Sequence, residues 1–505
     1  MSHILKAYLE RSGDRTGGAL DAGAVAYIAN LAQVASITPE VARAVVHELR
    51  DQRSHLKLIA SENFSSLATQ AAMGNLLTDK YAEGFVHHRF YAGCENVDDI
   101  EAVAAAEARK LFGAEHAFVQ THSGSDANLL AFWAILRNRV QVPLLEEMGE
   151  TNPAALSRED WDKIRVACGN QKILSMDLYS GGHLTHGYRM NLSAQMFDVH
   201  HYGVNPDTGL LDPDDLREKL HAIKPLIFLV GYSAYPRKID FKQMRALADE
   251  VGAVLMVDMA HFAGLVAGKV FTGAYDPVAH AHVATSTTHK TLRGPRGGIV
   301  LCTREFAESV DKACPMMMGG PLPQMMAAKA VAFREANGEA FRAYSARVQE
   351  NAAALAQACQ DQGMRVLTGG TDNHLLLIDV APFGINGRQA EMGLRECGFT
   401  LNRNTIPNDP QGPWYTSGLR LGTPSITTLG MGPDEMREIA ALLNIVLNDL
   451  QPAMIEKKGV TKASKAKYVL SNTVRDTARN RVQALLDRFV LYPELDLDFL
   501  TEHFG

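Results

Sequence analysis

Two short apolar runs with a helical segment between them constrain the fold more than any other feature of the sequence. The runs, residues 227–233 and 252–258, lack the polar alternation of a half-exposed strand and are typical of strands buried on both faces. Asp240 stands before the helical segment, where its side chain can cap the first turn. A strand, a helix and a second strand in this order predict a βαβ unit, and therefore an α/β fold with a mostly parallel sheet.

Polar residues stand where these strands end. Asp258 closes the second run, and Lys290 follows another strand-like stretch that begins at Val283 and leads into a glycine and proline turn. Because ligands of open α/β sheets gather outside the carboxyl ends of the strands, Asp258 and Lys290 can face one crevice. Such a pair suits pyridoxal phosphate, which needs a lysine for its aldehyde and a carboxylate for its pyridinium nitrogen. Taken singly, a turn lysine is usually a surface residue and an aspartate is often a helix cap.

Two glycine-containing turns add further candidates. Ser123, Gly124 and Ser125 lead into the helical segment 126–136, and the free N–H groups at a helix N-terminus bind phosphate. His183 follows two glycines, which allow the backbone to approach a flat ring closely. We therefore expect a phosphate cradle at the first turn, while His183 can lie over a ring.

The composition argues against several classes of function. The 50 basic and 57 acidic residues give a formal net charge of −7, which argues against a general nucleic-acid binder. The six cysteines are scattered without a C-x-x-C pair, so we expect no metal site and no disulfide framework, and a reducing cytoplasm fits best. The N-terminus shows no signal-peptide pattern, and no apolar run approaches the roughly 18 residues of a membrane span. We expect a cytoplasmic protein without nucleic-acid or membrane partners.

Several blocks that occur in a fixed order resemble the serine hydroxymethyltransferases. They are residues 58–63, 80–84, 122–125, 181–187, 257–261, 287–298 and 416–420. Each block alone is weak, but together they are highly specific and cover the chain from about residue 55 to about residue 450. The resemblance implies the aspartate-aminotransferase-like (type I) pyridoxal-phosphate fold. This fold has a mostly parallel seven-stranded sheet with helices on both faces and a smaller α+β C-terminal domain.

The resemblance and the residue patterns divide the chain into four parts. They are a helical arm (1–54), a large cofactor-binding domain (55–324), a small C-terminal domain (325–451), and a linker with a C-terminal helix (452–505). A charged, aperiodic stretch at about 138–172 breaks the resemblance and is expected to be a surface insertion. One long helix is expected from 325 to about 363, and the lysine-rich residues 452–470 are expected to be the linker.

The resemblance implies a role for each matching residue. Lys290 would hold the cofactor as a Schiff base while Asp258 keeps the ring nitrogen protonated, and Arg296 would keep the lysine region cationic. Glu83 would act as acid and base at the substrate hydroxyl, and Tyr91 would lie near the reacting amino acid. The implied cofactor contacts are Tyr81, Ser123, Gly124, Ser125, His183, Ser233, Asp258, His261, Thr287, His289 and Lys290. The implied catalytic residues are Lys290, Glu83, Asp258, His183 and Tyr91.

Substrate and folate contacts follow in the same way. Arg420 and Ser61 would bind the substrate carboxylate, because an arginine fork donates two parallel hydrogen bonds to a carboxylate. The implied folate contacts are Leu178, Gly182, Leu184 and Asn404. The implied reaction is the reversible transfer of the hydroxymethyl carbon of serine to tetrahydrofolate on pyridoxal 5'-phosphate, which gives glycine and 5,10-methylenetetrahydrofolate.

In this family the segment around residues 80–91 serves the active site of the partner subunit, so the resemblance implies a homodimer with shared sites. Whether dimers pair into tetramers stays open. Two departures from the family pattern occur. Phe90 stands where a tyrosine is usual, and residues 316–318 are methionines where relatives have glycine, serine or glutamine. Methionine takes positive φ less freely than glycine, so we expect the phosphate site to be reshaped there.

Two other functions stay open at this point. A folate-independent aldolase that cleaves 3-hydroxy amino acids would use the same cofactor and the same chemistry at Cα. His183 with its glycines, together with Asn404, favours the transferase over the aldolase. A catalytically idle relative that binds cofactor or RNA is the third candidate, and the intact Asp258 and Lys290 argue against it.

Overall fold

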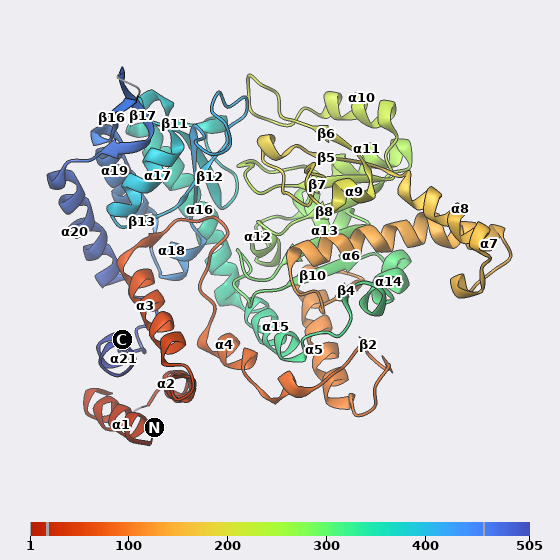
Figure 1. Ribbon diagram of the computed structural model, residues 1–505, viewed down its shortest axis with the longest axis horizontal. Coiled ribbons are helices and arrows are strands. Elements are labelled where there is room, and N and C mark those ends of the chain that lie inside the picture. Colours follow the sequence, from red (N-terminus) through yellow and green to blue (C-terminus); the bar gives the residue numbers. More distant parts are fainter. Residues whose placement is uncertain (1, 17–19, 458–459) are drawn as a thin grey trace.

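The centre of the computed structural model, which describes residues 2–16, 20–457 and 460–505, is a seven-stranded sheet (Figure 1). Its strands are β4 (His116–Phe118), β5 (Lys172–Met176), β6 (Asp198–Tyr202), β7 (Ile227–Gly231), β8 (Val254–Asp258), β9 (Val283–Thr287) and β10 (Gly298–Cys302). Their order is β4-β10-β9-β8-β7-β5-β6. The five strands from β9 to β6 pair in parallel, and β10 is antiparallel to both of its neighbours. The predicted mostly parallel, seven-stranded sheet is therefore confirmed.

Helices cover both faces of this sheet. On one face lie α5 (Glu95–Phe112), α10 (Pro213–Ile223), α11 (Phe241–Val251), α12 (Ala263–Ala267) and α15 (Pro323–Ala336), and on the other α6 (Gly124–Leu136) and α14 (Arg304–Asp311). Leu255 and Val257 belong to the apolar cluster of the first face, whereas Val254 and Met256 belong to that of the second. Because strand side chains alternate between faces, Asp258 falls on the face that α6 covers.

A second, four-stranded antiparallel sheet has the order β11-β12-β15-β14. Its strands are β11 (Arg365–Val366), β12 (Leu375–Asp379), β14 (Asn402–Asn404) and β15 (Gly418–Gly422). The helices packed with it are α16 (Glu339–Asp361), α17 (Gly387–Glu396), α18 (Pro424–Thr428), α19 (Pro433–Asp449) and α20 (Asn472–Arg488). The expectation of one helix from 325 to about 363 is wrong, because α15 ends at Ala336 and Gly338 is extended, with φ −81° and ψ 162°.

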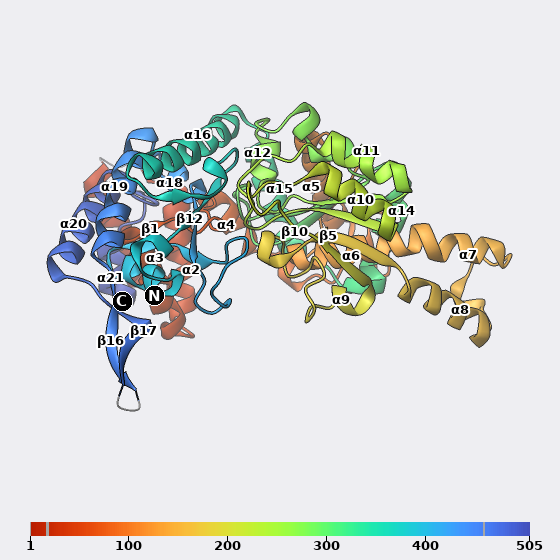
Figure 2. The ribbon, with the colours of Figure 1, turned by 90° about the horizontal axis from the view of Figure 1, so that it is seen from above.

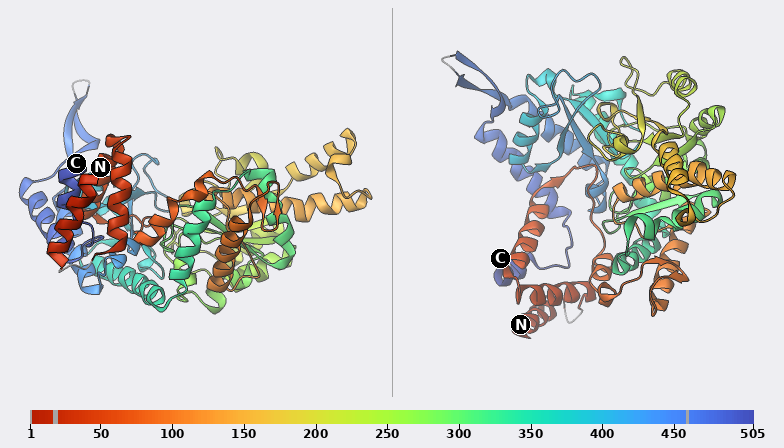
Figure 3. Two further views of the ribbon diagram at one scale, coloured as in Figure 1. Left: turned by 90° about the horizontal axis from the view of Figure 1, so that it is seen from below. Right: turned by 45° about the vertical axis from the view of Figure 1, so that its right-hand side comes forward.

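The two ends of the chain pack together. Helices α1 (Ser2–Thr16), α2 (Ala22–Ala35) and α3 (Pro39–Ser54) share one apolar cluster with α21 (Leu497–Phe504). Figures 1 and 3 show the N- and C-terminal helices side by side. Arg53 of α3 reinforces this contact by donating hydrogen bonds to the carbonyls of Leu491 (2.8 Å) and Leu495 (2.9 Å). None of the helices among the described residues is long and apolar enough to cross a membrane.

The lysine-rich stretch expected to be a linker is instead a β-hairpin that projects from the molecule (Figure 2). Its strands are β16 (Gln451–Lys457) and β17 (Val460–Val469). Two polar side chains at the start of α17 anchor it: Asn386 donates to the carbonyl of Lys465 and Gln389 to that of Ser464, both at 2.8 Å. The linker expectation failed because lysines that point into solvent can alternate along an exposed hairpin.

The stretch expected to be a surface insertion forms a helical projection at the far end of the large sheet (Figure 2). Its helices are α7 (Val142–Glu147) and α8 (Arg158–Gly169), and a π-helical turn, Arg137–Gln141, links α6 to α7. Ser157 caps the start of helix α8, because its side-chain oxygen accepts a hydrogen bond from the amide of Asp160. The remaining short elements are α4 (Leu67–Met73), α9 (Ser193–Met196), α13 (Pro277–His280), and the strand pairs β1 (Leu56–Lys57) with β13 (Phe399–Thr400) and β2 (Gly84–Phe85) with β3 (His88–Arg89).

Candidate active site

A cavity of about 630 Å³ lies between the carboxyl edge of the large sheet and the small sheet. Its walls come from residues that follow β7, β8 and β9 and from strands β14 and β15. The predicted site residues that line it are Ser61, Leu178, Gly182, His183, Leu184, Ser233, His261, His289, Lys290, Asn404 and Arg420. Segments more than 350 residues apart in the sequence thus meet at one hollow.

Lys290 lies in the turn after β9. The turn is closed by two backbone hydrogen bonds, from Thr288 N to Gly297 O (3.1 Å) and from Gly294 N to Thr288 O (2.7 Å). Burial lowers the pKa of Lys290 to about 8, against the opposing effect of the Asp258 carboxylate and with the help of the Arg420 charge. The lowered pKa means that a much larger share of the amine is neutral near pH 8 than for an ordinary lysine, which favours attack on an aldehyde.

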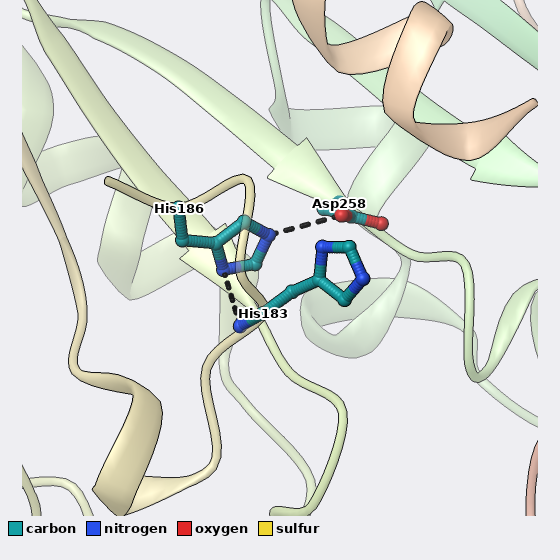
Figure 4. A group of neighbouring side chains, drawn as sticks. All are labelled: His183, His186 and Asp258. Carbon is teal, nitrogen blue, oxygen red and sulfur yellow. Dashed lines mark hydrogen bonds and ion pairs between the residues drawn. The ribbon is translucent and has the colours of Figure 1, made fainter. Parts of the chain in front are cut away.

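Asp258 ends β8 with both carboxylate oxygens occupied. Its Oδ2 accepts a hydrogen bond from Nε2 of His186 at 2.9 Å (Figure 4). Oδ2 also accepts one from Nδ2 of Asn128 at 2.9 Å, and Oδ1 accepts one from the amide of Ala260 at 3.0 Å. Burial raises the pKa of Asp258, but the hydrogen bonds and the nearby imidazoles outweigh it, so the pKa lies below its usual range. Asp258 is therefore a fixed negative charge beside the cavity.

His183, His186 and Asp258 have ligand atoms within 4.8 Å of one another, close enough to hold a metal ion. The hydrogen bonds explain the cluster without an ion. Nδ1 of His186 accepts from the amide of His183 at 3.3 Å, so Nε2 carries the proton that it donates to Asp258 (Figure 4). Both nitrogens of His186 are thus engaged, and this imidazole holds the carboxylate in place.

His183 is a neutral ring at the cavity wall. Its Nδ1 accepts from the amide of Thr185 at 3.2 Å, and burial, opposed by Asp258, lowers its pKa to about 4. The glycines before it are required by close packing. A Cβ at Gly182 would lie 2.2 Å from the carbonyl oxygen of Met176, and Gly181 has a φ of +113°. A neutral imidazole held in this way can stack on a flat ring.

Arg420 supplies positive charge from β15. It donates to the carbonyl of Ser233 at 2.6 Å and to Oδ1 of Asn402 at 3.1 Å. Burial lowers the pKa of Arg420 to about 10. Both partners are neutral oxygen atoms, so neither hydrogen bond compensates the guanidinium charge. Arg420 is therefore suited to bind a carboxylate in the cavity, and Ser61 lies on the same wall.

The turn expected to cradle a phosphate packs tightly against the end of β9. Ser123 caps α6 by accepting a hydrogen bond from the amide of Asp126 at 3.1 Å. A Cβ at Gly124 would lie 2.6 Å from Cγ2 of Thr287, so only glycine fits there. Thr287 donates its hydroxyl to the carbonyl of Ala260. Ser123, Gly124 and Ser125 thus lie next to Thr287, but they do not line the main cavity.

Tyr81, Glu83 and Tyr91 do not line this cavity either. Tyr81 and Tyr91 are 54% and 48% exposed, and their rings contact each other edge to face with centroids 4.9 Å apart. The Tyr81 ring lies close to Gly320, just after the three methionines. The positive φ in that loop falls on Gly319 (+73°) and on none of the methionines, so they impose no backbone strain there.

Several site residues were not anticipated from the sequence. His374 stacks on His261 with ring centroids 5.5 Å apart, and burial lowers its pKa to about 3. The other unanticipated residues are Asn128, Thr185, His186 and Asn402, which hold Asp258, His183 or Arg420. Thr185 and His186 had a visible signal, because both lie within three residues after His183 in the glycine-rich block.

Known proteins resemble the chain over nearly all of its length. The serine hydroxymethyltransferase family model matches residues 34–147 and 165–443. The serine hydroxymethyltransferase of Treponema pallidum (strain Nichols) is 59% identical over 501 residues, 99% of this chain and 86% of that protein. That of Salinispora tropica is 54% identical over 477 residues (94% and 99%), and that of Chlamydia trachomatis serovar D is 48% identical over 502 residues (99% and 100%). The stretch between the two matched regions falls within the helical projection.

Proposed function

The chain belongs to the serine hydroxymethyltransferase family, and we propose that it reversibly transfers the hydroxymethyl carbon of serine to tetrahydrofolate on pyridoxal phosphate. One observation carries this proposal. Lys290 and Arg420 line the same cavity as Leu178, Leu184 and Asn404, the residues expected to contact folate. One cavity thus contains an amine that can bind the cofactor and a guanidinium that can bind the substrate carboxylate. The same cavity has a surface for the second substrate, tetrahydrofolate.

The residues present fit pyridoxal phosphate. Asp258 is a buried carboxylate kept ionised, as a pyridinium nitrogen requires, and His183 is a neutral ring beside it. The buried Nδ1 of His289 has no hydrogen-bond partner among the described residues, so it is available to a bound group. Ser123 and Gly124 begin the 13-residue helix α6, whose N-terminus suits the phosphate.

When bound, pyridoxal phosphate supplies an electron sink for the negative charge that develops at Cα of the amino acid. The residues of this chain do the rest. Lys290 would offer a neutral amine to the aldehyde, and Asp258 would keep the proton on the ring nitrogen. Arg420 binds the carboxylate of serine and so orients the bonds at Cα. We assign to Glu83 the proton transfer at the side-chain oxygen of serine.

The position of Glu83 supports a homodimer with shared active sites. Tyr81 and Tyr91, on either side of Glu83 in the sequence, are exposed on the surface and do not line the cavity of their own chain. We propose that the segment 81–91 completes the cavity of a second subunit. The chain would then have no complete active site as a monomer.

The experiment that tests this function follows the side-chain carbon of labelled serine in the purified enzyme. We expect label to reach tetrahydrofolate and glycine to accumulate, with an absorption band that glycine produces and tetrahydrofolate strengthens. Cleavage of 3-hydroxy amino acids that ignores folate would instead support the aldolase. A protein that binds the cofactor but turns over neither substrate would support the idle relative.

A further inference from the structure

We propose that Arg89 is a positioning residue that fixes the backbone on both sides of Glu83. This inference rests on the proposed function, because the role of Glu83 at the substrate hydroxyl comes from the family resemblance. The structure adds what holds Glu83 where it is. Arg89 lies in strand β3, and its side chain is only 4% exposed although the neighbouring tyrosines are on the surface.

Three successive backbone carbonyls around Glu83 are held by hydrogen bonds. One nitrogen of Arg89, Nη1, donates to the carbonyls of Ala82 (3.0 Å) and Gly84 (2.9 Å), which flank Glu83. The carbonyl of Glu83 itself accepts from the amide of Phe90 at 3.0 Å. The guanidinium of Arg89 therefore fixes the peptide plane before Glu83 and the plane after Gly84, and the amide of Phe90 fixes the plane between them.

Gly84 shows how tightly this turn is built. Its φ is +107°, and a Cβ at this position would lie 2.2 Å from the carbonyl oxygen of His88. Only glycine accepts this conformation without strain. A turn that depends on one unusual backbone conformation needs partners that hold it, and Arg89 and Gln120 both donate to the Gly84 carbonyl.

The other nitrogens of Arg89 are held by two carboxylates of helix α5. Nε donates to Oδ1 of Asp98 at 2.8 Å, and Nη2 donates to Glu101. Gln120 donates hydrogen bonds to the carbonyl of Gly84 (2.9 Å) and to Oε1 of Glu101 (2.8 Å). It therefore links the turn around Glu83 to the carboxylate that pairs with Arg89. Since a planar guanidinium has five N–H donors in a fixed fork, lysine could not make this set of bonds.

Gln120 projects from a backbone that is itself fixed. The buried ammonium of Lys329 donates to the carbonyls of Val119 (2.6 Å) and Thr121 (2.8 Å), the residues on either side of Gln120. It also donates to the carbonyl of Gly298 at 2.9 Å, where β10 begins after the Lys290 turn. The Glu83 turn is therefore tied through buried polar groups to the backbone that carries the lysine loop.

Stability alone is a weak explanation for this arrangement. Buried ion pairs cost so much desolvation that well-packed apolar side chains often stabilise a protein as well or better. What a guanidinium adds is a fixed geometry at Ala82, Glu83 and Gly84. We therefore assign the cluster of Arg89, Glu101 and Gln120 to the placement of the Glu83 carboxylate.

The test compares two reactions of the Arg89→Lys enzyme. Folate-dependent cleavage of serine requires proton transfer at the side-chain oxygen. Exchange of the α-proton of glycine does not, because glycine has no side chain. We expect kcat for serine cleavage to fall at least about tenfold, a fraction of what a general acid or base contributes. Glycine exchange and the KM for serine should stay within about twofold, and Arg158→Lys, on the exposed helix α8, should change neither.

A double-mutant cycle with Glu83→Gln makes the inference falsifiable. If Arg89 acts through Glu83, the double variant is no slower than Glu83→Gln alone. Additive losses, or equal losses of serine cleavage and glycine exchange, would overturn the proposal. A wild-type enzyme without folate-dependent serine cleavage would overturn the proposed function instead, so the two failures are distinguishable.

A readout without the cofactor accompanies the kinetics. In the apoprotein the amide of Phe90, which is bonded to Glu83 O, should exchange its hydrogen faster in Arg89→Lys than in wild type. Unchanged exchange over residues 82–90 would contradict the positioning role. If Arg89→Lys does not fold, Gln120→Leu is the second variant. It removes one hydrogen bond to the carbonyl of Gly84, while Arg89 keeps its carboxylate partners. We expect from it a smaller loss of serine cleavage with unchanged glycine exchange, and a smaller rise in the hydrogen exchange of the Phe90 amide.

Discussion

Lys290 lies in a cavity lined by residues of its own chain, whereas Tyr81 and Tyr91, beside Glu83 in the sequence, are 54% and 48% exposed on the surface. Hydrogen bonds hold the backbone in both regions, but in different ways. Around Lys290, buried charges and rings converge on an empty volume from two sheets. Around Glu83, the buried charges of Arg89 and Glu101 hold the backbone, and the rings of Tyr81 and Tyr91 are exposed.

The comparison shows that residues which hold the backbone can be buried even where the functional side chains next to them are exposed. Arg89 is 4% exposed although Tyr91, two residues later, is on the surface. A surface segment that is held this firmly has few conformations to lose when it meets a partner, which lowers the entropic cost of association. The predictions below test whether the two regions really work as halves of one site.

The largest effect is expected from Lys290→Arg. A guanidinium stays protonated and cannot attack an aldehyde, so folate-dependent turnover of serine should be abolished. Turnover is measured with labelled serine and tetrahydrofolate, and Lys163→Arg on the exposed helix α8 is the matched control. A normal rate in Lys290→Arg would contradict the assignment of this lysine.

Co-expression of two inactive variants tests whether Glu83 contributes to the active site of the partner subunit. A subunit with Lys290→Arg and one with Glu83→Gln should form mixed dimers with one intact site each. Since random pairing makes half of all dimers mixed, activity should recover to about a quarter of wild type by the statistics of shared sites. No recovery in purified mixed dimers would place Glu83 in its own chain's site and break the comparison.

The lowered pKa of Lys290 predicts a specific pH profile. The neutral fraction of an amine with a pKa of about 8 rises about fivefold from pH 7 to pH 8 and less than twofold from pH 8 to pH 9. The rate at which the apoenzyme captures pyridoxal phosphate should follow this curve in stopped-flow absorbance. A rise of nearly tenfold per pH unit up to about pH 9 would indicate an ordinary, unshifted lysine.

The smallest effect is expected on the exposed side, from Phe90→Tyr. Phe90 is 67% exposed, so the added hydroxyl enters solvent instead of a buried contact. Turnover should stay within about twofold and the free energy of unfolding within about 0.5 kcal/mol, as for most surface substitutions. A gain in kcat of fivefold or more would show that the partner site lacks a hydroxyl at this position.

The parts of the site that depend on strand ends could be predicted, and those that depend on side-chain contacts between elements could not. Asp258 and Lys290 follow buried strands of one sheet, so their convergence was expected and the cavity agrees with it for Lys290. Asn128 lies on helix α6 and belongs to no local sequence motif. It meets Asp258 only because α6 packs on the face of the sheet to which the Asp258 side chain points. Contacts of this kind require the packed structure.

Local patterns also misled in two places. One helix was expected from 325 to about 363, but Asn337 and Gly338 end α15 and start α16. The lysine-rich residues 452–470 suggested a linker, although the chain forms a hairpin there with Asn386 and Gln389 as its anchors. In both cases a tertiary contact or a single extended residue outweighed the average character of the segment.

The shared cluster of the terminal helices has a consequence for how the protein is made. Helices α1 to α3 bury their apolar faces partly against α21, which begins more than 400 residues after α3 ends. On a ribosome that adds about 5 to 20 residues per second, the first three helices wait on the order of tens of seconds for that partner. Through this interval their apolar faces are incompletely covered, so nascent chains of this enzyme should depend on chaperones at these helices until α21 has left the ribosome.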